Sequence, residues 1–329
     1  MGGNVLPWYV SESTLSANSS MPQNPGKLRI GTRGSKLALV QAEMVRSLLA
    51  AKLCPCEIVV VKTTGDRVQD RSLADIGGKG LFTKELEQAL LAGEVDIAVH
   101  SMKDVPVAVP DGLAIRAILP REDPRDAFVS HIAPTLEQLP LRARIGTSSV
   151  RRQAQVARAR PDLEVLLLRG NVDTRLAKLD AGNYDAILLA YAGLKRLGLG
   201  ERATSLLSLQ DWLPALAQGA VGIEVRAADS ETANAVGVVN DTLSETALAC
   251  ERAFQAALDG SCKTPIAGLA AYTGDRLVFR GEVLAPDGSD FVETGFEIRM
   301  GADAVREAAE AGRESGLALK PRAAAWLAL

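Results

Sequence analysis

Strand-like and helix-like patterns alternate along the first hundred or so residues of the chain. A short strand-like run at 27–33 ends in a Gly/Ser loop, and residues 36–49 then carry apolar side chains at every third or fourth position. A β-branched run at 57–61 and an apolar run at 95–100 flank a second helical pattern at 83–91. Strands that alternate with helices are typical of βαβ units. We therefore expect a mostly parallel sheet covered by helices.

The same order of elements returns in the middle of the chain. Arg29-Ile-Gly-Thr32 is echoed by Arg144-Ile-Gly-Thr147, which leads into a helical pattern that continues to about Arg160. Strand patterns at 163–168 and 184–190 then follow, as they do in the first part. A match of only four residues is short enough to occur by chance, but the matching order of three strand-to-loop junctions favours two similar α/β domains.

The last part of the chain has a different pattern. It predicts a helix, two strands joined by a hairpin turn at Pro286-Asp-Gly288, and a second helix, at residues 244–258, 277–284, 291–299 and 302–315. Thr242-Leu-Ser-Glu245 is available as a capping box for the first of these helices. We expect a small α+β domain here, which makes three domains in all.

Composition excludes several classes of protein and of partner. The 329 residues are 47% hydrophobic and 23% charged, which excludes a disordered chain, a collagen-like repeat and a disulfide miniprotein. The net charge is −3 and aromatic residues are only 4%, so we expect no nucleic-acid partner. No apolar run approaches the length of a membrane span, so we expect no membrane partner.

The cysteines and residues 1–26 indicate the cellular compartment. The cysteines stand at 54, 56, 250 and 262, a spacing that makes no zinc pattern, so we expect no metal. This sparse use indicates a reducing compartment, and we expect the cytoplasm. Residues 1–26 contain no Lys or Arg, which excludes an ordinary secretory signal, and we interpret them as a flexible N-terminal extension.

Basic and hydroxyl side chains gather at the predicted carboxyl ends of the strands, where ligands bind in open α/β sheets. They are Arg33, Ser35, Ser101, Lys103, Thr147 to Arg152, and Arg169 to Arg175. Arg binds carboxylates or phosphates through two parallel hydrogen bonds, so several arginines imply several anionic groups. Arg151 and Arg152 stand at a helix start, where the dipole disfavours cations. A bound anion therefore explains them better than a solvated helix start.

Asp104, Cys262 and Lys79 are candidates for chemistry, each with a simpler alternative. Asp104 follows a buried strand, and Pro106 stiffens its loop, so its carboxylate could stabilise a developing cation or shuttle protons; the alternative is a turn cap. Cys262 has Lys263 beside it and could be nucleophilic, although most lone cysteines are inert. Lys79 lies in a Gly-rich loop, either solvated or near a ligand. His100, at the end of an apolar strand, is more simply structural.

A series of motifs runs in order from about residue 28 to 266. They are Gly31-Thr-Arg-Gly-Ser35, Gly77-Gly-Lys-Gly-Leu-Phe82, Asp96-Ile-Ala-Val-His-Ser-Met-Lys-Asp-Val-Pro106, Arg144-Ile-Gly-Thr-Ser-Ser149 with Arg151-Arg-Gln153, Leu168-Arg-Gly-Asn-Val172, Ala192-Gly-Leu-Lys-Arg-Leu197, Gln218-Gly-Ala-Val-Gly-Ile-Glu224 and Cys262. Together they resemble the porphobilinogen deaminase family, also called the hydroxymethylbilane synthase family. The resemblance implies two similar doubly wound, periplasmic-binding-protein-like α/β domains and a small α+β C-terminal domain. It implies domain 1 at 27–121 with 218–238, domain 2 at 122–217, and domain 3 at 239–329 with the cofactor cysteine.

The resemblance also implies a reaction. A dipyrromethane cofactor would be bound through a thioether to Cys262, and a transferase would join four porphobilinogen molecules head to tail with loss of ammonia. The product would be hydroxymethylbilane, the linear tetrapyrrole of haem and chlorophyll-type biosynthesis. Each porphobilinogen carries an acetate and a propionate, which suits the arginines. The implied partners are porphobilinogen and its oligomers, and the implied state is a monomer.

The resemblance assigns roles to residues of this chain. It assigns catalysis to Asp104, and it assigns cofactor and substrate binding to Arg33, Ser35, Lys79, Ser101, Lys103, Thr147, Ser149, Arg151, Arg152, Arg169, Asn171, Arg175, Arg196 and Gln218. Three positions depart from the family pattern. Ser261 stands where Gly is common, which affects loop flexibility, while Asp75 and Asp173 weaken the local positive field.

Two other functions compete with this interpretation. A non-catalytic, two-lobed anion-binding protein, such as a solute receptor, would need an export signal and has no use for a third domain with a special cysteine. An effector domain of a transcription factor belongs to the same two-lobed class, but the sequence shows no helix-turn-helix segment.

Overall fold

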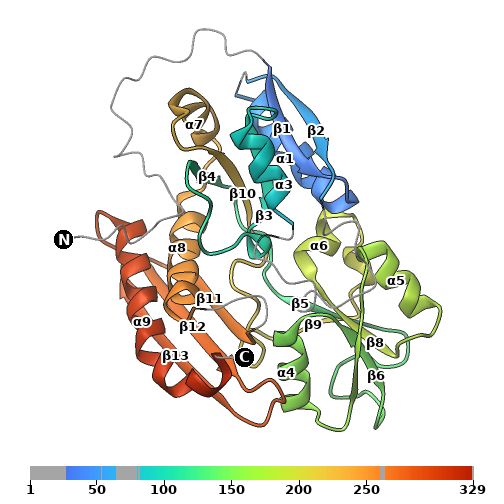
Figure 1. The fold of residues 1–329 in the computed structure, drawn as a ribbon. Helices are drawn as coiled ribbons and strands as arrows, with labels where there is room; N and C mark the ends of the chain where they lie inside the picture. The colour runs from blue at the N-terminus through green and yellow to red at the C-terminus, as the bar shows by residue number, and fades with distance from the viewer. Residues whose placement is uncertain (1–26, 53, 64–79, 81, 260–263, 328–329) are drawn as a thin grey trace. The chain divides into compact units, whose positions relative to one another are not determined.

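The computed structural model describes residues 27–52, 54–63, 80, 82–259 and 264–327. Of these residues, 27–121 and 220–245 form one compact unit, unit 1, and 122–219 and 246–327 form a second, unit 2. Each unit has its own cores. Figure 1 shows the elements of both along the chain.

Unit 1 is a five-stranded sheet in the order β2-β1-β3-β10-β4. Its strands are β1 (Leu28–Arg33), β2 (Cys56–Val61), β3 (Ile97–Ser101), β4 (Leu113–Ile118) and β10 (Val221–Arg226). Strand β1 runs parallel to β2 and β3, whereas β10 runs antiparallel to β3 and β4. The sheet is therefore mixed rather than mostly parallel, because β10 enters it from a distant part of the chain. Local periodicity cannot show such an insertion.

Helices cover both faces of this sheet. Helices α1 (Lys36–Ala50) and α7 (Ser230–Gly237) pack on one face, and their apolar side chains share a core with those of β1, β3 and β10. Helix α3 (Lys84–Leu91) packs on the other face through Leu86 and Leu90. This is the doubly wound arrangement that the alternation of strands and helices predicts.

Unit 2 repeats this plan in a sheet of order β7-β6-β8-β5-β9. Its strands are β5 (Asp126–Ser130), β6 (Arg144–Thr147), β7 (Glu164–Leu167), β8 (Ala186–Ala190) and β9 (Ser205–Leu206). Strand β6 is parallel to β7 and β8, and β5 is antiparallel to β8 and β9. Helix α4 (Val150–Ala159) covers one face, and α5 (Val172–Asp180) and α6 (Tyr191–Arg196) cover the other.

The repeat extends to single hydrogen bonds. Arg29 at the start of β1 donates from its backbone N (2.9 Å) and Nε (3.0 Å) to Asp96 Oδ2, and from Nη2 to Oδ1 (2.8 Å). Arg144 at the start of β6 makes the same three bonds to Asp185, at 2.7, 3.1 and 3.0 Å. We call these two contacts the arginine clamps. Their agreement supports two similar domains more strongly than the four-residue motif does.

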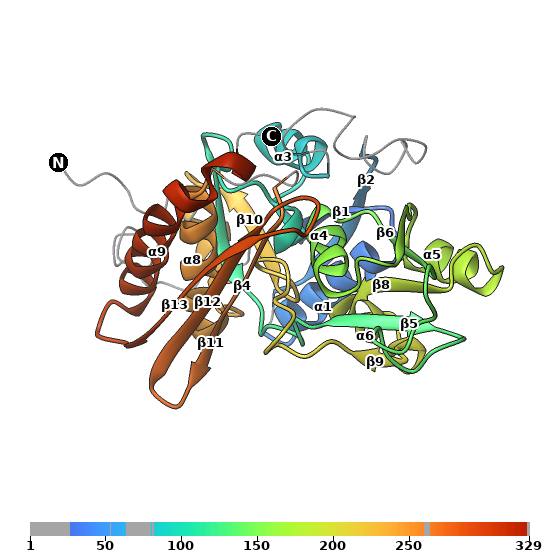
Figure 2. The same ribbon diagram turned by 90° about the horizontal axis from the view of Figure 1, so that it is seen from below.

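Unit 2 also contains an antiparallel sheet of β11 (Ile266–Thr273), β12 (Arg276–Leu284) and β13 (Phe291–Arg299), as Figure 2 shows. The hairpin between β12 and β13 confirms the sequence prediction. Strand β11 was not predicted, because its Ala and Gly residues give a weak strand pattern. Helices α8 (Thr242–Ala257) and α9 (Ala304–Leu327) share the core of this sheet.

Two details of these helices add to the sequence analysis. Helix α8 begins at Thr242, and Asp241 just before it caps the first turn, since its Oδ2 accepts the backbone N–H of Ser244 at 2.9 Å. Helix α9 does not end near Ser315 but continues through Pro321. Buried Leu319 and Ala323 keep the helical spacing beyond Ser315, and their burial holds the helix together past the proline.

Candidate active site

Unit 1 places its predicted site residues at the carboxyl ends of β1 and β3. Arg33 ends β1, and Ser35 caps α1 by accepting the backbone N–H of Ala38 at 3.3 Å. Ser101 ends β3, and Lys103 and Asp104 follow in a single 3-10 turn, η2 (Met102–Asp104). The topology thus brings together side chains from segments about seventy residues apart.

Asp104 and Arg33 form the charged pair of this edge. Arg33 Nη1 lies 4.0 Å from Asp104 Oδ2, and the side chains are 19% and 34% exposed, so ligand can reach both. The Arg33 guanidinium also lies over the Phe82 ring, 4.1 Å from its centroid. Phe82 was quoted in a motif but given no role by the sequence analysis, because a lone aromatic residue carries no spacing that marks it.

Buried polar contacts hold the end of β3 that carries this edge. Ser101 Oγ and the Gln41 amide form hydrogen bonds of 2.9 and 3.1 Å, and Gln41 is buried in α1. His100 Nε2 lies 2.9 Å from Glu224 Oε2, and both side chains are buried. His100 thus has an acidic partner inside the fold, which agrees with a structural histidine. Gln41 is a site residue that the sequence analysis missed, since a glutamine inside a helical pattern resembles a surface position.

Unit 2 places its predicted residues at the carboxyl ends of β6, β7 and β8. Ser149 caps α4 by accepting the backbone N–H of Arg152 at 3.4 Å, and Thr147 Oγ1 accepts the Ser149 N–H at 3.2 Å. The first turn of α4 then holds Arg151 and Arg152, which are buried. The hydroxyl residues therefore act first as supports for the helix start that carries the arginines.

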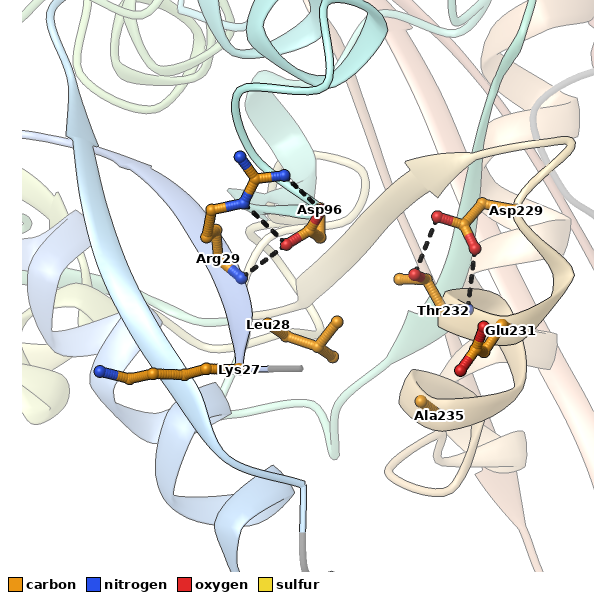
Figure 3. Close-up of a pocket in the computed structure, with 8 residues that line it drawn as sticks. All are labelled: Lys27, Leu28, Arg29, Asp96, Asp229, Glu231, Thr232 and Ala235. Carbon is orange, nitrogen blue, oxygen red and sulfur yellow. Dashed lines mark hydrogen bonds and ion pairs between the residues drawn. The ribbon is translucent and has the colours of Figure 1, made fainter. Parts of the chain in front are cut away.

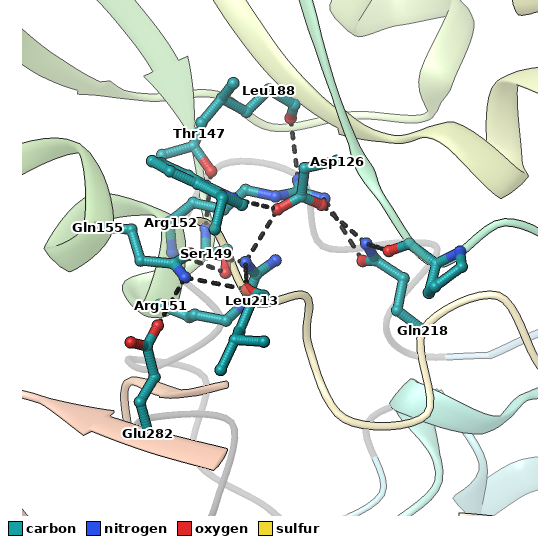
Figure 4. A network of polar contacts seen from close by, with 12 residues as sticks. Asp126, Thr147, Ser149, Arg151, Arg152, Gln155, Leu188, Leu213, Gln218 and Glu282 are labelled. Atoms are coloured by element: carbon teal, nitrogen blue, oxygen red, sulfur yellow. Dashed lines mark hydrogen bonds and ion pairs between the residues drawn. The ribbon is translucent and has the colours of Figure 1, made fainter. Parts of the chain in front are cut away.

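Arg151 and Arg152 share one internal carboxylate, Asp126, in the network of Figure 4. Arg151 Nη1 donates to Asp126 Oδ2 (2.8 Å), and Arg152 Nη2 donates to Oδ1 (2.6 Å). Gln218 Nε2 also donates to Oδ1 (2.7 Å) and Trp212 Nε1 to Oδ2 (2.9 Å). The sequence analysis expected the two arginines beside a bound anion, and the structure gives them an anion of the protein itself.

Electrostatics of this network follow from its burial. Burial opposes ionisation of Asp126, but the charges of Arg151 and Arg152 outweigh it and hold the pKa of Asp126 well below its usual range. Burial lowers the pKa of Arg151 despite the attraction of Asp126. The Nε atoms of Arg151 and Arg152 are buried without a hydrogen-bond partner. The pair thus retains donor capacity that the protein does not use.

The network reaches the antiparallel sheet of unit 2. Gln155 Oε1 accepts from Arg151 Nη1 (2.7 Å), and Gln155 Nε2 donates to Glu282 Oε1 on β12 (2.9 Å). Arg158 Nη1 donates to Glu282 Oε2 (3.2 Å). Asp126, Gln155 and Glu282 were missed by the sequence analysis. The sequence gives one indication of Asp126: it is an acidic residue at the first position of a mostly apolar strand.

Three further arginines lie on the same edge of unit 2. Burial lowers the pKa of Arg169 and of Arg196. Arg196 Nη2 donates to the Gly219 carbonyl (2.6 Å), and its Nε is buried without a partner. Arg175 Nε donates to the carbonyl of Gly170 (2.7 Å), whose φ of 116° forms the sharp turn before Asn171. Buried guanidiniums with unused donors are suited to anionic ligands.

Two of the predicted residues, Lys79 and Cys262, lie outside the described residues, as do Asp75 and Ser261. Unit 1 also has a pocket at the opposite, amino end of β1, next to the clamp of Arg29 and Asp96 (Figure 3). Most of its charged lining residues have ion-pair partners: Arg29 is held by Asp96, and Arg226, next to the pocket, has its Nη2 2.7 Å from Asp229 Oδ2 and 3.5 Å from Asp96 Oδ1. We therefore place the candidate site at the carboxyl ends and not here.

Within the described ranges, no group of three or more His, Cys, Asp and Glu side chains could hold a metal ion. In the same part of the chain, no helix combines the length and the apolar character that crossing a membrane requires.

Comparisons with known proteins point to one family. The family model described as "Porphobilinogen deaminase, dipyromethane cofactor binding domain" matches residues 28–234, and "Porphobilinogen deaminase, C-terminal domain" matches residues 246–320. The porphobilinogen deaminase of Nitrobacter hamburgensis is 53% identical over 295 residues, covering 87% of this chain and 93% of the relative. That of Nitrobacter winogradskyi is 52% identical over 295 residues, with the same shares of both chains.

Solved structures with a similar arrangement are more distant. The methionine-binding protein MetQ gives a TM-score of 0.43 at 12% identity, over 66% of this chain and 90% of that chain. A periplasmic substrate-binding protein of an ABC transporter from Coxiella burnetii gives 0.41 at 15% identity, over 64% and 91%.

Proposed function

The chain belongs to the porphobilinogen deaminase family, and from that premise we propose which of its residues carry the reaction. The enzyme is a transferase that joins four porphobilinogen molecules head to tail, releases ammonia and yields hydroxymethylbilane for tetrapyrrole biosynthesis. It uses a dipyrromethane cofactor. The alternative, a non-catalytic two-lobed anion-binding protein, is not favoured, because matches to the enzyme family extend over both units.

The site residues fit a group that carries several carboxylates. Each pyrrole unit brings an acetate and a propionate, and the described arginines of unit 2 include buried Nε donors without partners, on Arg151, Arg152 and Arg196. When bound, dipyrromethane supplies the carbon to which the first substrate is joined. We assign carboxylate binding to the predicted basic residues of each unit by itself: in unit 1 these are Arg33 and Lys103, and in unit 2 they are Arg151, Arg152, Arg169, Arg175 and Arg196.

One observation carries the catalytic assignment: the partly exposed Asp104 carboxylate lies 4.0 Å from Arg33 at the carboxyl end of β3. Loss of ammonia from porphobilinogen leaves positive charge on a pyrrole nitrogen. A fixed carboxylate stabilises that charge and accepts the hydrogen bond of the pyrrole N–H. The same carboxylate can take up the proton that leaves after the new bond forms.

We propose Cys262 as the attachment point, and the other three cysteines support this by their surroundings. Burial raises the pKa of the Cys54 thiol, raises that of Cys56 to about 12, and raises that of Cys250 well above its ordinary value. A thiol must ionise to act as a nucleophile, so these three are poor candidates.

The sheets support a proposal on the domains of the protein, and the cysteines support one on its compartment. We propose three domains, at 27–121 with 218–238, 122–217 and 239–329, since each of the three sheets has its own core. We propose a monomer that acts in the cytoplasm; the free thiols of Cys54, Cys56 and Cys250 support a reducing compartment.

Mass spectrometry of the intact purified chain tests the assignment of Cys262. The wild-type chain should be heavier than its sequence by a two-pyrrole adduct, and Cys262→Ala should fold but lack it. Cys54→Ala, Cys56→Ala and Cys250→Ala are matched controls that should keep the adduct. A peptide map with the adduct on any other residue would refute the assignment.

A further inference from the structure

The Asp126 carboxylate contacts both arginines of the pair in unit 2 and two further polar side chains. Its two oxygens accept four hydrogen bonds of 2.6–2.9 Å, from Arg151, Arg152, Trp212 and Gln218. Its side chain is 0% exposed. A fully buried carboxylate with saturated oxygens has no capacity left for a ligand, so any role it has in binding acts through its partners.

Both guanidiniums are held from further sides. Arg152 Nη1 donates to the Leu188 carbonyl (2.9 Å), and Arg151 Nη1 donates to the Leu213 carbonyl (3.0 Å) and to Gln155 Oε1 (2.7 Å). These contacts fix long side chains that would otherwise sample many rotamers. A ligand that meets them loses less entropy to ordering, which is the advantage of preorganisation.

The arginine pair has more positive charge than its own carboxylate offsets. Arg151 and Arg152 share the single carboxylate of Asp126, so two minus one leaves one positive charge, while Glu282 is paired with the partly exposed Arg158. A buried charge without a partner is costly. A carboxylate of a ligand at the pair offsets that charge.

We propose that Asp126 is a positioning residue for cofactor loading: its one carboxylate orients Arg151 and Arg152 in the apoenzyme and leaves a single positive charge for a carboxylate of dipyrromethane. The inference rests on the proposed binding role of the two arginines. It adds that Asp126, which touches no ligand, sets how fast the cofactor is acquired.

Asp126→Asn is the direct test, because each oxygen of Asp126 accepts from a guanidinium. In either orientation of the asparagine, its NH₂ group faces one of the two arginines and leaves that guanidinium without its acceptor. Asp185→Asn is the matched control, because it removes the carboxylate that holds Arg144 in another arginine-carboxylate contact of unit 2.

The measurement is the rate at which apoprotein gains the two-pyrrole adduct from added porphobilinogen, followed by intact mass. Each of the two porphobilinogen molecules is joined through its aminomethyl carbon and loses its amino group as ammonia. The apoprotein is purified from cells that cannot make porphobilinogen. Loading of Asp126→Asn should be at least roughly tenfold slower, since a hydrogen bond to a charged group is lost. Asp185→Asn should load at the wild-type rate. Wild-type loading by Asp126→Asn would overturn the inference.

A mutant cycle with the double variant Arg151→Met/Arg152→Met separates positioning from general destabilisation. If Asp126 acts through the two arginines, adding Asp126→Asn to this double variant slows loading no further. Additional slowing in the triple variant would overturn the inference.

A milder variant covers the case in which Asp126→Asn does not fold. Trp212→Phe deletes only the indole donor to Asp126, and its loading should slow by about threefold, the effect of one modest hydrogen bond. Unchanged loading of Trp212→Phe would then count against the inference. If the wild-type apoprotein gains no adduct, both the proposed function and this inference are wrong. If the wild type gains the adduct but the variants load at the same rate, only this inference is wrong.

Discussion

The arginines of this chain differ in the partner that the fold gives each one. Arg29 and Arg144 are held by a carboxylate at the amino end of a sheet, while Arg33 stacks on Phe82 and lies near the partly exposed Asp104. Sequence reasoning could place basic residues at strand ends, because motif and periodicity locate those ends. It could not find Asp126, which is 25 and 26 positions away from Arg151 and Arg152. Pairing across that distance depends on tertiary structure.

Asp104 is the residue whose charge we expect to matter most for turnover. Asp104→Asn keeps the size but cannot offset a developing positive charge, so its single-turnover rate with porphobilinogen should fall by on the order of 10²–10³. Asp104→Glu keeps the charge but displaces it, and should be impaired yet clearly faster than the Asn variant. Both should be assayed on protein shown to carry the cofactor. An Asn variant that reacts at the wild-type rate would make Asp104 a turn cap.

Asp126 should also determine how stability responds to acid. Its folded-state pKa lies below the unfolded value of about 3.9, so its contribution is complete above that value and is lost as the pH falls through the folded-state pKa. Asp126→Asn should cost about 3–5 kcal/mol near neutral pH, because it leaves buried guanidiniums uncompensated. The difference from wild type, measured by urea unfolding, should be constant from about pH 7 to 5 and shrink below about pH 4. A difference that grew in acid would contradict this.

Elements with a strong local pattern were predicted well, and those defined by distant partners were not. Helix α1 and the β12–β13 hairpin follow their apolar spacing and turn residues. The return of the chain to the first domain near β10 was expected only through the family resemblance, and the antiparallel pairing of β10 with β3 and β4 was not expected at all. Local periodicity predicts that a segment forms a strand but not which strand it pairs with, because several strands could pair there in a suitable register.

The two hairpin turns of the antiparallel sheet differ in their surroundings, which gives a matched test. Gly274 and Gly288 both have positive φ, of 62° and 74°. A Cβ on Gly274 would meet nothing within 4 Å, whereas one on Gly288 would lie 2.5 Å from the backbone N of Arg158 and 2.7 Å from the carbonyl O of Ala154 in α4. The β12–β13 turn therefore packs directly on the helix that carries the arginine pair.

Gly274→Ala should cost only about 1–2 kcal/mol, the penalty of the left-handed backbone. Gly288→Ala should cost about 1–3 kcal/mol more, because the backbone of α4 must move. Urea midpoints of the two variants measure this difference. Equal losses would mean that the β12–β13 turn yields without disturbing α4.

At the scale of the whole molecule, the chain consists of two units, and each has an arginine clamp of its own. The clamps join the first and third strands of each parallel set, β1 with the residue before β3 and β6 with the residue before β8. Because each unit has its own cores, we expect damage to one clamp to remain within its unit.

Hydrogen exchange of backbone amides tests this independence. Asp96→Asn should speed exchange in β1 and β3 and leave β6 and β8 unchanged, and Asp185→Asn should do the reverse. Each variant is the control for the other. Faster exchange in both units from either substitution would show that the units open as one.

The clamps have a consequence for how such a chain can be altered. They lie at the amino edge of each sheet and fix the spacing of its strands, while Arg33, Asp104, Arg151 and Arg152 project from the opposite edge. The residues that hold the strands together and the residues proposed for the reaction therefore lie at opposite ends of the same short strands. A loop moved from the carboxyl edge of one unit to that of the other would join strands held by an equivalent clamp. We therefore expect such an exchange to leave the sheet of the recipient unit unchanged.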